Sequence, residues 1–472
     1  GEWIDNGDFT MLMLSSPNGF QFFKYAGTIK LNGKELKHQS FGIHTAVEAP
    51  NSGNKKISFE KNGVEEGSFT VPPPSKNIQL ISINGAKSSV NIDLTKDVVL
   101  ELANFSTIPE SLIRVDIVTS IIGMRSLTMA AYVKPAAKVV IPAAAFRNLE
   151  TQNKGTGFKN SYLMVSDQQL VKSVAQSGVF KEPVIAVTGS NAGMWVNVTN
   201  SPEIAKGITF SDIEKVNGSE LEVSVKKLNA AYAMPLSFAK KIAVASMSIQ
   251  GTTQLYESKT NNWTKTETTK SIDFPQIPEE WLQEVLAGMY AQFTQATAAV
   301  SNGQVLPESA IPSAPSYELV QNFFEDEMNT ADQFLTVYKN LNPIKPLTSS
   351  SMRLFGENAL LKETSADALL KVSIALQLSY DGKPAMTPYL TVEMDGVSNG
   401  GFRSFVGNTK YFSITIKGAP YIIKKGKSLT KDELAKIVQT NDLATAYKNA
   451  LINLKDKEAA IGDYEIVWKL QQ

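Results

Sequence analysis

Alternating apolar and polar positions dominate the chain up to about residue 274, and this period of two is typical of strands buried on one face. Residues 112–118 (LIRVDIV) are the clearest example, because their charged side chains stand between apolar ones. Asparagine–glycine pairs at Asn32-Gly33 and Asn62-Gly63 separate such runs and predict tight two-residue hairpins, and Asn84-Gly85 predicts a turn. The pattern therefore predicts an all-β N-terminal half.

The periodicity becomes helical after residues 275–278. Pro278 is followed by Glu279 and Glu280, and acidic side chains in a first turn suit the helix dipole. The apolar face of this predicted helix consists of Trp281, Leu282, Val285, Leu286, Met289, Tyr290 and Phe293. A second helix is predicted with an apolar side made of Leu319, Val320, Phe323, Phe324, Phe334, Leu335 and Tyr338.

Strands and helices mix beyond residue 350. Apolar residues at every second position from Leu370 to Leu378 predict a long strand, and residues 390–394 predict its hairpin partner. Thr430 and Glu433 have the spacing of a capping box, which predicts that a helix starts there. A final strand is predicted from the alternation of Tyr464, Ile466, Trp468 and Leu470.

A chain of 472 residues exceeds one hydrophobic core, and about 150 residues per domain suggests roughly three domains. Three consecutive prolines in residues 71–75 (VPPPS) mark the clearest boundary, because proline cannot continue a ladder. Seven short strands in the next roughly 95 residues predict a β-sandwich. The predicted units are a small β unit (1–74), a β-sandwich (75–170), a β-rich domain (171–275) and a helical and mixed α/β domain (276–472, with a helical part 276–345 and a sheet part 350–472). The predicted fold class is thus multidomain, all-β and then α/β (α+β).

Composition excludes several classes of protein. The chain has 46 basic and 46 acidic residues, so it lacks the positive charge that nucleic-acid binding requires. No apolar run reaches the ~20 residues of a membrane-spanning helix, so neither a nucleic-acid partner nor a membrane span is expected.

The chain contains no cysteine and only two histidines, His38 and His44. Disulfides, zinc–thiolate sites and iron–sulfur clusters are therefore excluded, and histidine-assisted nucleophiles are excluded within the later domains. The two histidines would share a face of a continuous strand, but a metal site would need a carboxylate such as Glu48 as well. No metal ligand, catalytic residue or cofactor is assigned. Paired carboxylates remain open as glycosidase chemistry, so the question of an enzyme is open and leans toward none.

Trp195 and Trp263 are the candidate ligand-stacking residues. Both lie in polar, turn-prone surroundings, where an exposed indole would offer a flat face to a sugar ring. The alternative for each is an ordinary buried indole.

Two segments resemble known bacterial modules. Residues 139–146 (VVIPAAAF) and 160–165 (NSYLMV) resemble the last strands of immunoglobulin-like modules in large bacterial surface proteins. The order of elements in 316–472, with the strand entry at 366–370 (ADALL), resembles periplasmic α/β domains of envelope assembly lipoproteins such as the curli secretion lipoprotein and the Tol system's propeller protein. The whole chain is similar in style to surface lipoproteins of gut Bacteroidetes.

These resemblances imply a non-enzymatic extracytoplasmic protein, at the cell surface or in the periplasm, that acts in binding, adhesion or envelope assembly. They also imply a protein or glycan partner at the envelope. The chain opens Gly-Glu-Trp without an initiator methionine, so a lipid anchor upstream of residue 1 is part of this expectation. The alternative is a glycan-binding protein or a carboxylate-dependent glycoside hydrolase.

Overall fold

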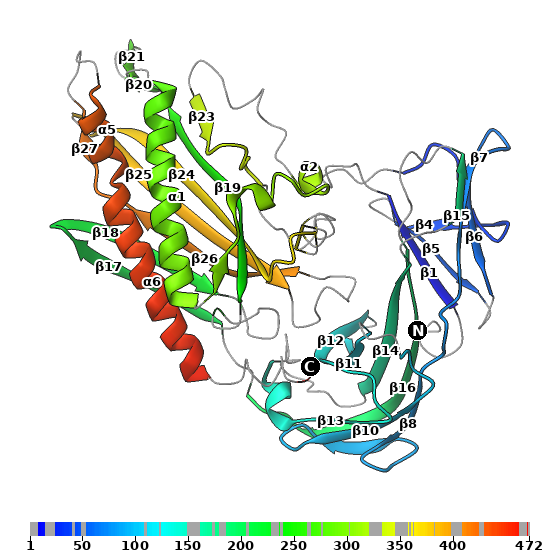
Figure 1. The fold of residues 1–472 in the computed structure, drawn as a ribbon. Coiled ribbons are helices and arrows are strands. Elements are labelled where there is room, and N and C mark those ends of the chain that lie inside the picture. Colours follow the sequence, from blue (N-terminus) through cyan, green and yellow to red (C-terminus); the bar gives the residue numbers. More distant parts are fainter. Residues whose placement is uncertain are drawn as a thin grey trace.

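A computed structural model shows strands in the first part of the chain and a mixture of strands and helices in the second (Figure 1). It describes residues 8–14, 24–39, 43–48, 53–107, 111–121, 124–148, 161–171, 175–178, 186–203, 207–227, 236, 239–261, 266–274, 277–301, 303–320, 333–344, 357, 360–361, 363–381, 383–397, 408–423, 429–461 and 470. The predicted all-β N-terminal half is confirmed, since the described residues before 275 form strands and one short 3-10 helix, η1.

The first part of the chain contributes two small sheets, with strand orders β1-β5-β4 and β15-β7-β6-β2-β3. Their strands are β1 (Asp8–Met13), β2 (Thr28–Leu31), β3 (Lys34–Glu35), β4 (Lys37–His38), β5 (Ile43–Glu48), β6 (Lys55–Lys61), β7 (Val64–Val71) and β15 (Ala175–Gly178). Asn32 and Asn62 have positive φ angles of 49° and 51° in the turns, which confirms the predicted Asn-Gly hairpins. The small apolar core consists of Ile29, Leu31, Leu36, Ile57, Phe59 and Phe69.

The next two sheets enclose a larger apolar core, with strand orders β13-β10-β8 and β12-β11-β14-β16-β9. Their elements are β8 (Gln79–Ile83), β9 (Val90–Asp93), β10 (Val98–Ala103), β11 (Ile113–Ile121), β12 (Met124–Val133), β13 (Lys138–Ile141), η1 (Ala143–Asn148), β14 (Ser161–Val171) and β16 (Ala186–Asn200). Ile113, Val115 and Ile117 of β11 lie in this core. The strand is nevertheless buried on both faces, since Asp116 is 0% and Val118 3% exposed, so the predicted one-sided burial is wrong.

Strands of the segment 171–275 are distributed over several sheets. β15 pairs with β7, β16 pairs with β14 and β9, and three later strands join the C-terminal sheet. The domain boundaries drawn from the sequence remain predictions, and the sheets are the units described below.

The second part of the chain is built on a nine-stranded mixed sheet of order β17-β18-β26-β25-β24-β19-β22, in which β23 also pairs with β19 and β27 with β25. The strands are β17 (Ile208–Val216), β18 (Ser219–Lys227), β19 (Lys241–Thr252), β22 (Gln304–Val305), β23 (Gln333–Val337), β24 (Ala368–Asp381), β25 (Lys383–Val397), β26 (Asn408–Lys417) and β27 (Tyr421–Ile422). A separate hairpin joins β20 (Gln254–Asn261) to β21 (Thr266–Asp273). The helical elements are α1 (Glu279–Ser301), η3 (Glu308–Ala310), α2 (Tyr317–Val320), α5 (Lys431–Val438) and α6 (Thr440–Ile461).

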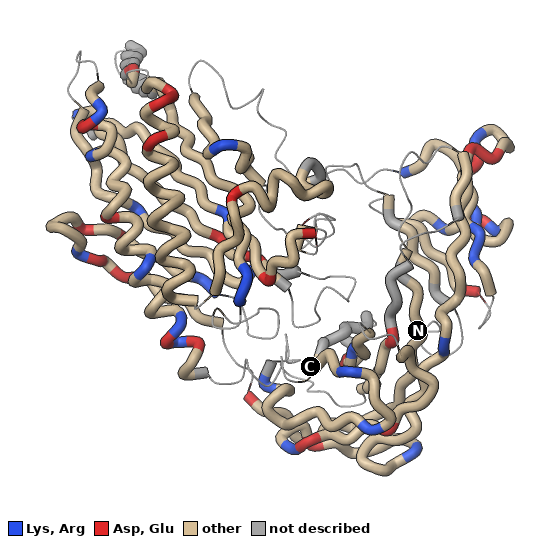
Figure 2. The backbone as a smooth tube through the Cα atoms, in the orientation of Figure 1, with Lys and Arg blue, Asp and Glu red and all other residues tan. Residues whose placement is uncertain are grey.

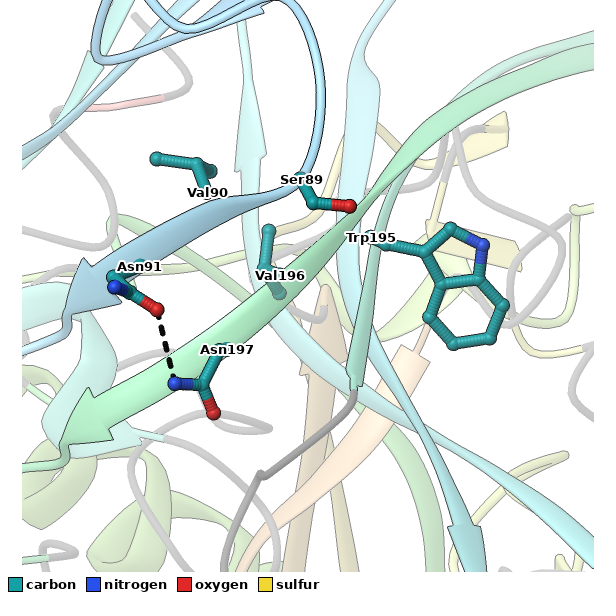
Figure 3. Close-up of a pocket in the computed structure, with 6 residues that line it drawn as sticks. All are labelled: Ser89, Val90, Asn91, Trp195, Val196 and Asn197. Atoms are coloured by element: carbon teal, nitrogen blue, oxygen red, sulfur yellow. Dashed lines mark hydrogen bonds between the residues drawn. The ribbon is translucent and has the colours of Figure 1, made fainter.

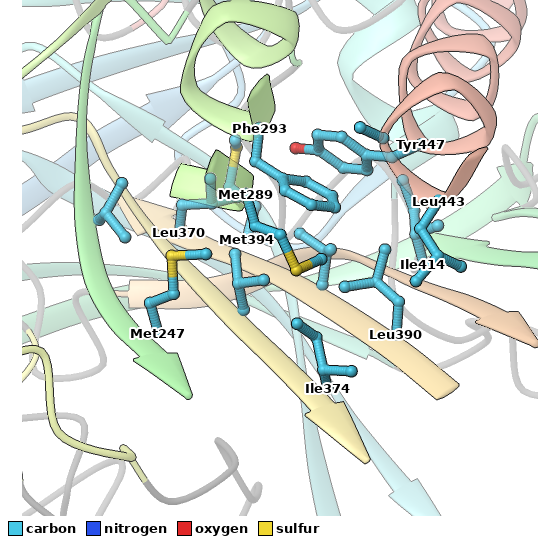
Figure 4. Close-up of a cluster of buried hydrophobic side chains, with 14 of the residues drawn as sticks. Met247, Met289, Phe293, Leu370, Ile374, Leu390, Met394, Ile414, Leu443 and Tyr447 are labelled. Atoms are coloured by element: carbon cyan, nitrogen blue, oxygen red, sulfur yellow. The ribbon is translucent and has the colours of Figure 1, made fainter. Parts of the chain in front are cut away.

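Helices α1 and α6 lie side by side over one face of this sheet (Figure 1). Alternate residues of β24, including Leu370 and Ile374, point toward the helices, where Phe293 of α1 and Tyr447 of α6 meet them (Figure 4). α5 begins at the predicted capping box, because Thr430 and Glu433 exchange side-chain-to-backbone hydrogen bonds. The apolar faces predicted for the helix after Pro278 and for the strand from Leu370 to Leu378 therefore pack together in one shared core.

The predicted second helix is wrong in its later part. Residues 333–337 form strand β23, which pairs antiparallel with β19. The Phe334 ring lies where a β-carbon on Gly251 would come within 2.5 Å of it, so a glycine in β19 makes room for the ring. Tertiary pairing with an existing sheet thus overrides the local helical pattern.

Charged residues of both signs are interspersed along all parts of the described backbone (Figure 2). No described helix has the length and apolar character needed to cross a bilayer. Of the predicted final strand, only Leu470 lies among the described residues. Its carbonyl accepts a hydrogen bond of 3.1 Å from the Lys134 amide, and its side chain packs against the larger apolar core between the two sheets. Leu470 is thus attached to the N-terminal half.

Two tyrosines of the second part should report alkaline unfolding. Burial raises the pKa of Tyr290 and that of Tyr317 from 10.0 to about 12. A phenol whose pKa is higher in the folded state stabilises the fold below pH about 10, and this stabilisation is lost as the pH rises to about 12. Alkaline titration of tyrosinate absorbance should therefore show a class that ionises near pH 12 as the helical circular dichroism disappears. Ionisation of every tyrosine near pH 10 with the helical signal intact would contradict this expectation.

Candidate functional site

Trp195 stands on the outer face of the five-stranded sheet, near the middle of β16. Its neighbours Met194 and Val196 point into the larger apolar core, so the alternation of the strand places Trp195 and Asn197 on the opposite face. The Trp195 side chain is 48% exposed, unusual for so large an apolar group. The structure thus places one of the two predicted stacking residues at the surface.

Tyr162 of β14 supports the Trp195 indole from the side. The two residues are directly paired across the strands, and their ring centroids lie 5.4 Å apart with planes inclined by 75°. Such an edge-to-face contact suits the ring quadrupoles and fixes the indole orientation. Gly193 makes room for the tyrosine ring, because a β-carbon there would come within 2.2 Å of it.

A shallow hollow of about 330 Å³ lies beside the indole (Figure 3). It is lined by Ser89, Val90, Asn91, Trp195, Val196 and Asn197. The edge strand β9 runs parallel to β16 and pairs with it only from Val90 and Val196 onward. β9 therefore does not cover the edge of β16 at Trp195. Asn197 Nδ2 donates a 2.9 Å hydrogen bond to Asn91 Oδ1, which holds the two amides in a fixed orientation. The hollow therefore combines an aromatic side with amide and hydroxyl groups.

None of the described residues that line this hollow is acidic. The two carboxylates about 5–10 Å apart that a glycosidase needs are therefore not found among these lining residues.

Of the two predicted stacking residues, Trp263 lies outside the described residues, so the structure places only Trp195. Sequence reasoning missed Tyr162, Asn91 and Asn197. The alternation of β16 signals that Asn197 shares a face with Trp195, whereas Asn91 reaches the site through a parallel pairing between distant strands.

Among the described residues, a buried cluster of charged side chains lies on the nine-stranded sheet. Lys371 of β24 forms ion pairs with Glu357 and with Asp395 of β25, and the Nζ–Oε1 distance to Glu357 is 2.5 Å. Glu357 and Asp395 are both 0% exposed. Burial opposes the charged ammonium, but the two carboxylates outweigh it and raise the pKa of Lys371 above its ordinary range. Because Lys371 pairs with both acids at once, the three side chains form a structural ion cluster.

A second buried pair joins the sheet to α6. Lys227 Nζ lies 3.5 Å from Glu458 Oε1, and the other Glu458 oxygen accepts a 2.7 Å hydrogen bond from the Leu236 amide. Burial lowers the pKa of Lys227, while Glu458 opposes this shift. The pair connects the end of β18 to the last helix.

The two histidines meet across strands β4 and β5. His38 and His44 are direct partners in the ladder, with ring centroids 5.0 Å apart. His44 is 4% exposed, and neither of its ring nitrogens makes a hydrogen bond of regular geometry. Burial lowers the pKa of His44, opposed by the nearby Leu36 backbone and reinforced by His38 and Lys24. The described residues contain no cluster of three or more potential metal-ligating side chains.

Comparisons of the chain with protein-family models, with curated proteins and with solved structures found no match.

Proposed function

We propose that this chain is a non-enzymatic binding protein of the bacterial envelope, and that its ligand is a carbohydrate that stacks on Trp195. The single observation that carries the proposal is the half-exposed indole, fixed in orientation by Tyr162 beside a hollow lined with amides.

The chemistry of the hollow suits a sugar ring. One face of a pyranose presents C–H groups, which pack on an aromatic plane, while its hydroxyl groups need partners that both donate and accept hydrogen bonds. Asn91, Asn197 and Ser89 supply such partners without a net charge. A neutral glycan therefore fits better than a phosphorylated or strongly charged ligand.

The location is proposed on the resemblance to surface and periplasmic lipoproteins, with a lipid anchor upstream of residue 1. Within this proposal, the immunoglobulin-like module of residues 75–170 contributes Asn91 and Ser89 to the glycan site, while Trp195 comes from the following β-rich segment. The C-terminal α/β domain is the surface that docks on another envelope component. Cell fractionation of the producing organism tests the location, because a cytoplasmic protein would contradict it.

Trp195→Ala should strongly weaken the binding of any glycan found by screening the intact protein on a glycan array. Loss of a central tryptophan contact costs about 2 kcal/mol or more, which corresponds to roughly a thirtyfold rise in Kd. The measurement is isothermal titration calorimetry with the strongest glycan from the array.

Two variants control this experiment. Trp195→Phe keeps an aromatic plane and should retain part of the affinity, while Val140→Ala changes a residue of the same sandwich that is 45% exposed and should leave Kd unchanged. A glycan that binds Trp195→Ala as tightly as the unaltered chain would show that its site lies elsewhere.

A further inference from the structure

The only two histidines of the chain face each other across two neighbouring strands, although they are six positions apart in the sequence. His38 lies on β4 and His44 on the central strand β5 of the first small sheet. Leu12 of β1 pairs with His44 on its other side and packs against the small apolar core. The face that carries both imidazoles is therefore the inner face of the sheet, and His38, which is less buried, stands at its edge.

The spacing of the two rings matches that of two ligands on one metal ion. An ion bound about 2.0–2.1 Å from each ligating nitrogen lies about 3.2 Å from each ring centroid, so ligand angles of about 90–109° place the centroids about 4.5–5.2 Å apart. The observed separation of 5.0 Å falls in this interval, and the planes are inclined by 62°. The backbone pairing thus holds the two ring centroids at a separation that is compatible with a shared metal ion.

Independent support comes from the incompletely satisfied ring of His44. Buried polar groups are nearly always hydrogen-bonded, because an unsatisfied one costs about 1–3 kcal/mol. His44 is 4% exposed, and neither ring nitrogen makes a hydrogen bond of regular geometry. The Leu36 backbone makes a weaker hydrogen-bonding contact with the ring, which leaves the other ring nitrogen for a metal ion, and a backbone carbonyl is the usual second partner of a metal-ligating histidine.

We propose that His38 and His44 form a binding site for a divalent transition-metal ion of the copper, nickel and zinc group. Imidazole is a preferred ligand of these ions, and copper should bind most tightly. Because no cluster of three or more ligating side chains occurs among the described residues, water completes the coordination and the site is weaker than a structural zinc site. The nearby Lys24 ammonium opposes binding, but it is exposed and therefore screened by salt.

The test is isothermal titration calorimetry of the intact chain, prepared without a polyhistidine tag, with copper, nickel and zinc chlorides in a buffer that does not bind metals. One equivalent should bind, with copper tightest. His38→Gln should weaken binding at least about tenfold, the loss expected when a metal–ligand shell is disturbed. Lys37→Gln, an exposed neighbour on the same strand, should bind as the unaltered chain does.

His44→Gln should have the same effect as His38→Gln, but His44 is 4% exposed, so its replacement also disturbs the packing of the sheet. His38→Gln therefore decides the question, together with electron paramagnetic resonance of the copper complex. Two coupled nitrogens are expected in the unaltered chain and one in His38→Gln. Unchanged affinity in His38→Gln, or a copper spectrum without imidazole nitrogen coupling, would show that the pair is only an aromatic contact.

Discussion

Replacing Lys371 by methionine is expected to lower the free energy of unfolding of the C-terminal part by about 3–5 kcal/mol, because it leaves two buried carboxylates without their cation. Glu357 and Asp395 are both 0% exposed, so water cannot replace the lost charge unless the sheet opens. Urea unfolding followed by helical circular dichroism measures the effect, since the described α-helices all lie in this part of the chain.

A nearby ion pair provides the matched control. Lys410 of β26 pairs with Glu393 of β25, but their side chains are 24% and 17% exposed. Lys410→Met should therefore cost clearly less than Lys371→Met, because water reaches both partners of this pair. Adding Asp395→Asn to Lys371→Met should recover part of the stability, because it removes one unpaired charge. Equal losses for Lys371→Met and Lys410→Met would contradict the description of the Lys371 site as a buried ion cluster.

Phe293→Ala is expected to destabilise the same part by about 3–5 kcal/mol, the usual cost of truncating a buried aromatic ring. Phe293 is 1% exposed, and its ring lies 4.9 Å from that of Tyr447 between α1, α6 and the sheet (Figure 4). The same urea experiment measures this change.

Ile452→Ala is the control for that experiment. Ile452 lies on α6 but is 42% exposed, so its truncation leaves no internal cavity and should change the free energy of unfolding by less than about 1 kcal/mol. If Phe293→Ala cost as little as Ile452→Ala, the two helices would not share one core with the sheet.

Features encoded by short stretches of sequence were predicted well. The Asn32-Gly33 and Asn62-Gly63 hairpins and the Thr430 capping box depend on neighbouring residues alone, so their physics is contained in a few positions. Strand β24 was likewise recognisable, because its apolar alternation is long and uninterrupted.

Features that depend on distant partners were not predicted. Phe334 and Leu335 have a helical spacing with their neighbours, yet they form β23, because β19 offers an unpaired edge and Gly251 offers space. The candidate glycan site likewise depends on partners that are distant in the sequence. Trp195 was identified by its polar surroundings, whereas its partners arrive from strands β9 and β14 and are set by sheet topology.

The proposal of a glycan site is tested most directly by the indole N–H signals of the chain in nuclear magnetic resonance. The chain has five tryptophans, and Trp195→Phe identifies the signal of Trp195 by its disappearance. On addition of the glycan selected by the array, the account predicts that the Trp195 signal shifts with a saturating dose response while the other indole signals stay in place. A Trp195 signal that stays in place while the glycan binds would contradict it.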